Sequence, residues 1–140
     1  MLIKKATYKE LLDEMNSIII TPEGNSMLPL LKGGINAVKI SKSNRKLYKY
    51  DVILYQRDNE QYVLHRIIKI KNGKYLLCGD NQLVPETNIN KNMILGIMDG
   101  YFSGDNFIDV NNTEYKKYSK RRVRNRKWRR LASFLKRIFK

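Results

Sequence analysis

The chain has little of the chemistry that builds metal or disulfide sites. Among 140 residues there is one cysteine, Cys78, and one histidine, His65. A single cysteine excludes an internal disulfide and any site made from several thiolates, and a single histidine excludes His-rich metal sites. Neither common glycine-rich phosphate-binding loop occurs. We therefore expect no metal ion and no cofactor.

Long apolar runs are missing as well. The run SIIIT at residues 17–21 is far too short to span a bilayer, and the N-terminus lacks the sustained apolar stretch of a signal peptide. These features predict a cytoplasmic protein. The length and a hydrophobic content of 42% predict one domain with a single core.

Acidic residues are absent from the last 25 positions. Of the net charge of +15, this segment carries 13 basic residues, so residues 1–115 carry only about +2. Binding to an acidic partner is therefore expected of the tail and not of the rest of the chain.

The pattern of residues 7–109 predicts a short helix followed by an antiparallel β body. TYKELLDEMN has apolar residues at helical spacing, with Thr7 as N-cap and Glu10 completing a capping box. Short β-type runs follow, separated by turn-forming residues: SIIIT, AVKIS, DVILYQR, QYVLHRIIKI, KYLLCGD, MILGIMDGYF and NFIDV. The clearest hairpin joins two of these runs through Asn72-Gly73, which favours a tight turn.

Three segments together resemble a known family. In order along the chain they are GNSMLPLL at residues 24–31, YVLHRIIKI at 62–70 and CGDNQ at 78–82. The set resembles the signal peptidase I superfamily, which also contains the LexA-type self-cleaving peptidases. Because His65 stands before the arginine where many bacterial signal peptidases have lysine, the chain is similar to the Ser-His branch.

The resemblance implies a fold and a catalytic site. The fold would be mainly β, a small antiparallel β-barrel-like signal-peptidase/LexA-type domain with a short N-terminal helix. Ser26 would be the nucleophile and His65 its general base, with Asp80 supporting the ring as the third group of a triad. A neutral imidazole with a pKa of about 6.5 suits this role near pH 7.

The first motif would also shape the substrate site. The resemblance places oxyanion and substrate binding at Gly24, Asn25, Met27 and Pro29, with the Ser26 N–H as one oxyanion donor. Gly24 stands where many bacterial signal peptidases have a serine, so a second oxyanion donor is not identified. After GDN, only Glu86 offers the further acidic residue that the family usually has. A surface serine, a core histidine and a turn aspartate are the structural alternative for the three catalytic residues.

The C-terminal segment predicts an amphipathic basic helix. At 100° per residue, KWRRLASFLKRIFK places an apolar arc opposite its lysines and arginines. This pattern is typical of helices that lie on anionic membranes, and it would bring Trp128, Leu131, Leu135, Ile138 and Phe139 into contact with the bilayer. Docking of the arc on the β body ranks second, and nucleic-acid binding through the basic block ranks third.

The sequence thus predicts a catalytic domain at residues 1–112 and a basic helix or tail at 113–140. The predicted function is a signal-peptidase-like serine endopeptidase that cleaves an extended peptide or precursor protein, located in the cytoplasm at the membrane surface. Two alternatives stay open: a self-cleaving or inactive regulatory relative of the LexA type, and a basic membrane or nucleic-acid adaptor.

Overall fold

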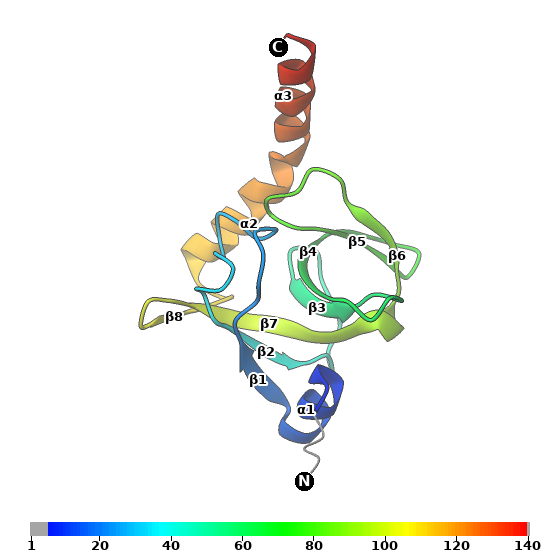
Figure 1. The fold of residues 1–140 in the computed structure, drawn as a ribbon, viewed down its shortest axis with the longest axis vertical. Coiled ribbons are helices and arrows are strands. Elements are labelled where there is room, and N and C mark those ends of the chain that lie inside the picture. Colours follow the sequence, from blue (N-terminus) through cyan, green and yellow to red (C-terminus); the bar gives the residue numbers. More distant parts are fainter. Residues whose placement is uncertain (1–5, 140) are drawn as a thin grey trace.

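The computed structural model describes residues 6–139 (Figure 1). It begins with α1 (Tyr8–Met15), whose N-cap is the predicted Thr7: the Thr7 hydroxyl accepts from the Glu10 N–H at 3.1 Å. The strands that follow are β1 (Ser17–Ile20), β2 (Val38–Lys42), β3 (Val52–Gln56), β4 (Tyr62–Lys71), β5 (Lys74–Cys78), β6 (Glu86–Ile89), β7 (Ile94–Ser103) and β8 (Asn106–Asp109), with a short 3₁₀ turn, η1 (Lys91–Met93), before β7. The chain ends in two helices, α2 (Thr113–Arg124) and α3 (Arg126–Ile138).

The strands form one antiparallel sheet. The order is β1-β2-β7-β3-β4-β5-β6, with β8 paired to β7. The sheet curls strongly but does not close, because β1 and β6 stand at the two ends of this order (Figure 1). The predicted mainly β class is therefore confirmed, in the form of an open curled sheet. The predicted hairpin between β4 and β5 is also present, with positive φ angles at Asn72 and Gly73 as its tight turn requires.

The central strand β3 explains how the sheet is stabilised. Four consecutive residues, Val52–Tyr55, are buried, so the strand is covered on both faces. Val52 and Leu54 belong to one hydrophobic cluster and Ile53 and Tyr55 to the other. The first cluster includes Leu12 from α1 and Met27 from the loop after β1, and this packing holds the predicted nucleophile loop against the sheet.

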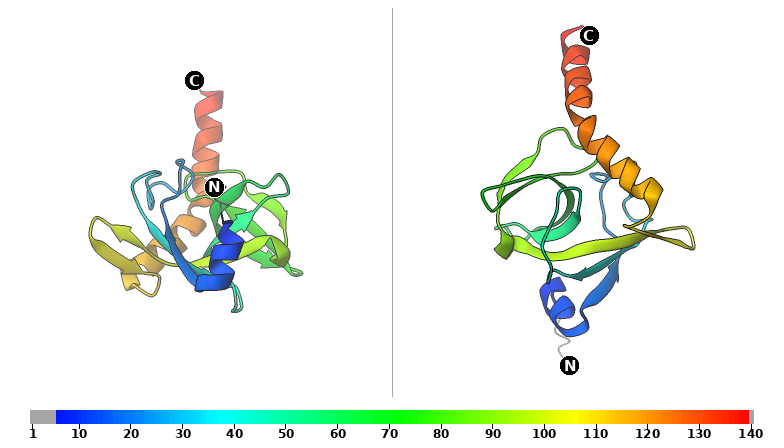
Figure 2. Two further views of the ribbon diagram at one scale, coloured as in Figure 1. Left: turned by 60° about the horizontal axis from the view of Figure 1, so that its bottom comes forward. Right: turned by 180° about the vertical axis from the view of Figure 1, so that it is seen from behind.

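The C-terminal segment contains two helices where the sequence predicted one. Asn125 ends α2 and precedes α3. In Figure 1 and in the right-hand view of Figure 2, α2 lies along the body whereas α3 extends beyond it. Docking of the apolar arc of α3 on the body, the second-ranked prediction, is therefore wrong. Trp128, Leu131, Leu135, Ile138 and Phe139 are between 42% and 81% exposed.

Two parts of the tail do contact the body: α2, through polar and aromatic residues, and the start of α3, where Arg126 and Arg129 donate to backbone carbonyls. Tyr115 and Ser119 are buried, and both accept hydrogen bonds from Arg66 on β4, at 3.2 Å and 2.8 Å. Their spacing of four residues puts them on one face of the helix. This face carries polar and aromatic side chains and no aliphatic stripe, so a search for aliphatic periodicity does not detect it.

Candidate active site

Ser26 and His65 line the same cavity, of about 500 Å³. The cavity lies between the loop after β1 and strand β4. Its walls also include Gly24, Met27, Leu54, Val63 and Gln82. Two segments 39 residues apart in the chain thus bring the predicted nucleophile and the predicted base to one site.

The serine loop is shaped by close backbone contacts. Gly24 has φ of +88°, a conformation that favours glycine. Gly33 packs directly on it, since a Cβ at Gly33 would come within 1.9 Å of the Gly24 carbonyl oxygen. Met27 is 5% exposed and anchors the loop in the core. Ser26 beside it is only partly buried.

Not every residue predicted for the substrate site reaches the cavity. Gly24 and Met27 line it, but Asn25 and Pro29 are exposed and do not. Within residues 6–139 the backbone N–H of Ser26 has no hydrogen-bond acceptor. This N–H is therefore not used in another hydrogen bond of the described residues.

His65 is 3% exposed, and Tyr55 holds its ring at the Nδ1 edge. The Tyr55 hydroxyl lies 3.2 Å from the His65 Nδ1 atom, and it donates its own proton to the Glu86 carboxylate at 2.5 Å. Because that proton is used, the Tyr55 oxygen accepts from Nδ1–H. The neutral ring then carries its free lone pair on Nε2, as a general base requires.

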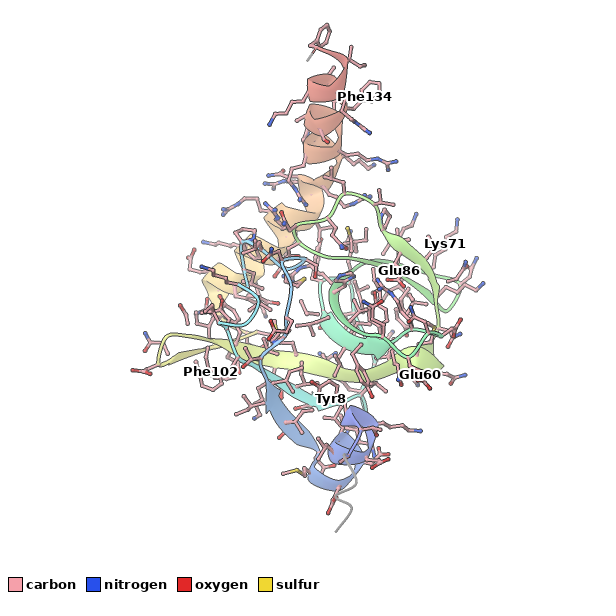
Figure 3. All side chains as sticks on the ribbon, viewed as in Figure 1. Tyr8, Glu60, Lys71, Glu86, Phe102 and Phe134 are labelled. Atoms are coloured by element: carbon pink, nitrogen blue, oxygen red, sulfur yellow. The ribbon has the colours of Figure 1, made fainter. Side chains whose placement is uncertain are left out.

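Glu86 (labelled in Figure 3) completes this arrangement. Arg57 donates to both of its oxygens, at 2.8 Å and 2.9 Å, and these bonds are the main reason that its pKa lies below the usual range. Glu86 therefore stays ionised, and the Tyr55 hydroxyl connects its carboxylate to the His65 ring. A protonated imidazole would be stabilised by this negative charge.

Burial keeps His65 neutral. It is the main cause that lowers the pKa of His65 to about 4, and the nearby guanidinium of Arg57 adds to it, against the opposing charges of Glu86 and Asp80. The pKa of His65 thus lies below the ordinary histidine value of about 6.5. At neutral pH the ring is unprotonated, which is the state in which it can accept a proton.

Ser26 and His65 do not hydrogen-bond in the structure, which describes residues 6–139. Hydrogen bonds between a nucleophile and its base are often long without substrate and shorten when substrate binds. The shared cavity, and not a bond already formed, is the observation that joins the two residues.

Asp80 does not hold the position that a triad requires. Its carboxylate accepts from Arg66 Nε and Nη2, both at 2.8 Å, and from the Tyr118 hydroxyl at 2.8 Å, and it makes no hydrogen bond with His65. The reason is the period of a strand: His65 and Arg66 are consecutive on β4 and point to opposite faces. Asp80 lies on the Arg66 face, toward α2, so the predicted contact with the imidazole is wrong.

Sequence reasoning identified Glu86 only as a candidate acidic residue and missed Tyr55. Tyr55 pairs with Val63 across the two strands, so it is the diagonal neighbour of His65 on the same face. A hydroxyl at the end of the apolar run VILY, residues 52–55, was the available signal.

No helix between residues 6 and 139 is both long enough and apolar enough to cross a bilayer. In comparisons with known proteins, no family model matches the chain, and no curated protein sequence matches it.

Proposed function

We propose that this protein is a serine endopeptidase that cleaves an extended peptide through an acyl-enzyme on Ser26. The observation that carries the proposal is the cavity shared by Ser26 and a neutral, buried His65. The order of the three sequence motifs, similar to that of the signal peptidase superfamily, supports the same reading.

The chemistry follows from the groups present. His65 Nε2 takes the Ser26 proton as the hydroxyl oxygen attacks a substrate carbonyl, and the Ser26 N–H stabilises the oxyanion. The imidazolium keeps its Nδ1–H bond to Tyr55, behind which lies the Glu86 carboxylate. His65 then gives its proton to the leaving amine, and water hydrolyses the ester in a second step.

The test is to incubate the purified protein with a random peptide library and to search for cleavage and for a peptidyl adduct on Ser26 by mass spectrometry. We expect cleavage and an adduct with the wild type and neither with Ser26→Ala. Cleavage that survives Ser26→Ala would refute the proposed mechanism. Fragments of the protein itself, formed without added peptide, would instead favour the self-cleaving alternative.

We further propose that α3 holds the enzyme on an anionic membrane surface. The apolar arc of α3 is exposed on the part of the helix that projects from the body, where Figure 3 labels Phe134. Arginines and lysines occupy the opposite face of the helix. Basic side chains near an anionic surface contribute about 1 kcal/mol each. A nucleic-acid partner would use the same charges but leave the apolar arc without a role.

Vesicle flotation tests this location. The full chain is expected to float with phosphatidylglycerol-containing vesicles and to stay in solution with purely zwitterionic ones, because both the apolar arc and the charges are needed. A variant with Leu131→Ser, Leu135→Ser and Ile138→Ser keeps every charge and should lose most of the flotation. Equal flotation of the variant and the wild type would contradict the proposal, and RNA binding that the variant retains would favour the third alternative.

A further inference from the structure

One turn of the chain packs against the backbone of the candidate nucleophile, Ser26. This support turn, residues 79–83, follows β5 and packs on the Ser26 loop. The Asn81 N–H donates to the Ser26 carbonyl at 2.9 Å, and the Asn81 side-chain amide donates to the Asn25 carbonyl at 3.1 Å. Gly79 approaches so closely that a Cβ there would lie 2.5 Å from the Ser26 carbonyl oxygen. The position of the Ser26 backbone therefore depends on where the support turn lies.

The outer side of the same turn is held by three arginines of the C-terminal helices. Arg122 Nε and Arg129 Nη1 both donate to the Asp80 carbonyl, at 2.8 Å and 2.9 Å. Arg126 Nη1 donates to the Leu83 carbonyl at 3.2 Å. We call Arg122, Arg126 and Arg129 the arginine clasp.

The clasp is built into the junction of the two helices. Its members are four and three residues apart, so they share one helix face across Asn125. Arg129 also donates to the Arg122 carbonyl, at 3.4 Å, and thereby bridges α2 and α3. Hydrogen bonds from a charged donor are stronger than neutral ones. Two guanidinium groups on one carbonyl oxygen use both of its lone pairs.

The proposal rests on the proposed function. We infer that the arginine clasp positions Ser26 through the support turn, so that the C-terminal helices are a working part of the active site. The contacts run without a gap from Arg129 to the Asp80 carbonyl, and from Asn81 to the Ser26 carbonyl. Since the oxyanion donor is the N–H of Ser26 itself, a small displacement of this backbone moves both the nucleophile and the donor. The clasp residues are positioning residues and do not touch the cavity.

The experiment compares three pairs of substitutions in the full chain. Arg122→Ala with Arg129→Ala removes the shared carbonyl contacts. Arg121→Ala with Arg130→Ala is the matched control, because it removes the same charge from exposed positions of the same helices. Arg122→Lys with Arg129→Lys keeps a cationic donor at each position. Two measurements are made on each: kcat and KM for a library peptide that the wild type cleaves, and amide hydrogen exchange in residues 24–28 and 79–83.

For the clasp pair we expect a loss of about tenfold or more in kcat with KM changed less than twofold, and faster exchange in both segments. The lysine pair should recover a large part of kcat, and the control pair should resemble the wild type. An unchanged kcat in the clasp pair would overturn the inference, even if exchange rises, since the clasp would then be only structural. If the wild type cleaved no peptide, the proposed function would fail, while exchange would still report whether the clasp orders the Ser26 loop.

Discussion

Replacing His65 with glutamine is expected to lower kcat for peptide cleavage by about 10³-fold, within the range that a positioned general base contributes. Glutamine keeps a donor that can reach the Tyr55 hydroxyl, which lies 3.2 Å from the ring, but it cannot accept a proton from serine. In the proposed mechanism Ser26 and His65 act as one unit, so the double variant with Ser26→Ala should be no less active than the worse single variant. The measurement is kcat and KM for each variant, with circular dichroism to show that the fold is kept.

The pH profile of the wild type provides the control for this prediction. His65 must be neutral to act as base, and burial lowers its pKa to about 4. Cleavage should therefore be constant from neutral pH down to about pH 5 and fall tenfold per unit below about pH 4. An acid limb centred near the ordinary histidine value of about 6.5, with the protein still folded, would show that the base is another group or that the ring is hydrated during catalysis.

The lowered pKa of His65 also makes the stability of the folded state depend on pH. The folded state holds His65 neutral with a pKa below its unfolded value, so protonation favours unfolding. This contribution to stability is complete above about pH 6.5 and is lost as the pH falls toward 4. The folded fraction must therefore be measured at each point of the acid limb.

Local patterns predicted most of the elements. The α1 cap at Thr7, seven of the strands and the turn at Asn72-Gly73 all follow from residues close together in the chain. The strand β6 was missed because ETNI has little apolar content and only four residues. The order of the strands was not predictable in this way, since β7 pairs with both β2 and β3, and such pairing depends on packing between distant segments.

For the candidate site, too, the sequence predicted some features and missed others. The resemblance placed Ser26 and His65 in one site, and the structure gives them a common cavity. The resemblance also identified Asp80 as a carboxylate of the site, but it did not show which cationic side chain this carboxylate pairs with. The partner is Arg66, buried to the same extent, and the groups that support His65 are Tyr55 and Glu86. Those contacts are set by strand register, which motif spacing does not report.

Replacing Asp80 with asparagine is expected to reduce the free energy of unfolding by about 3–5 kcal/mol, because it leaves the buried Arg66 guanidinium without its counter-charge. Both side chains of this pair are at most 2% exposed. Such a loss is a large part of the 5–15 kcal/mol that typically stabilises a domain. Urea unfolding followed by circular dichroism measures it. Asp13→Asn is the control, since the Lys42–Asp13 pair is well exposed and its loss should have an effect below about 1 kcal/mol.

The same variant separates two roles of Asp80 through its activity. If Asp80 oriented the His65 ring, the asparagine variant would lose about 10⁴-fold in kcat while folded, as a triad aspartate does. In the structure, however, the Asp80 carboxylate accepts hydrogen bonds from Arg66 and Tyr118. The Asp80 backbone carbonyl accepts from Arg122 and Arg129, and the substitution leaves this carbonyl in place. We therefore expect less than a tenfold loss in kcat per folded molecule, at low temperature and without urea. A loss near 10⁴-fold under those conditions would return Asp80 to the catalytic site.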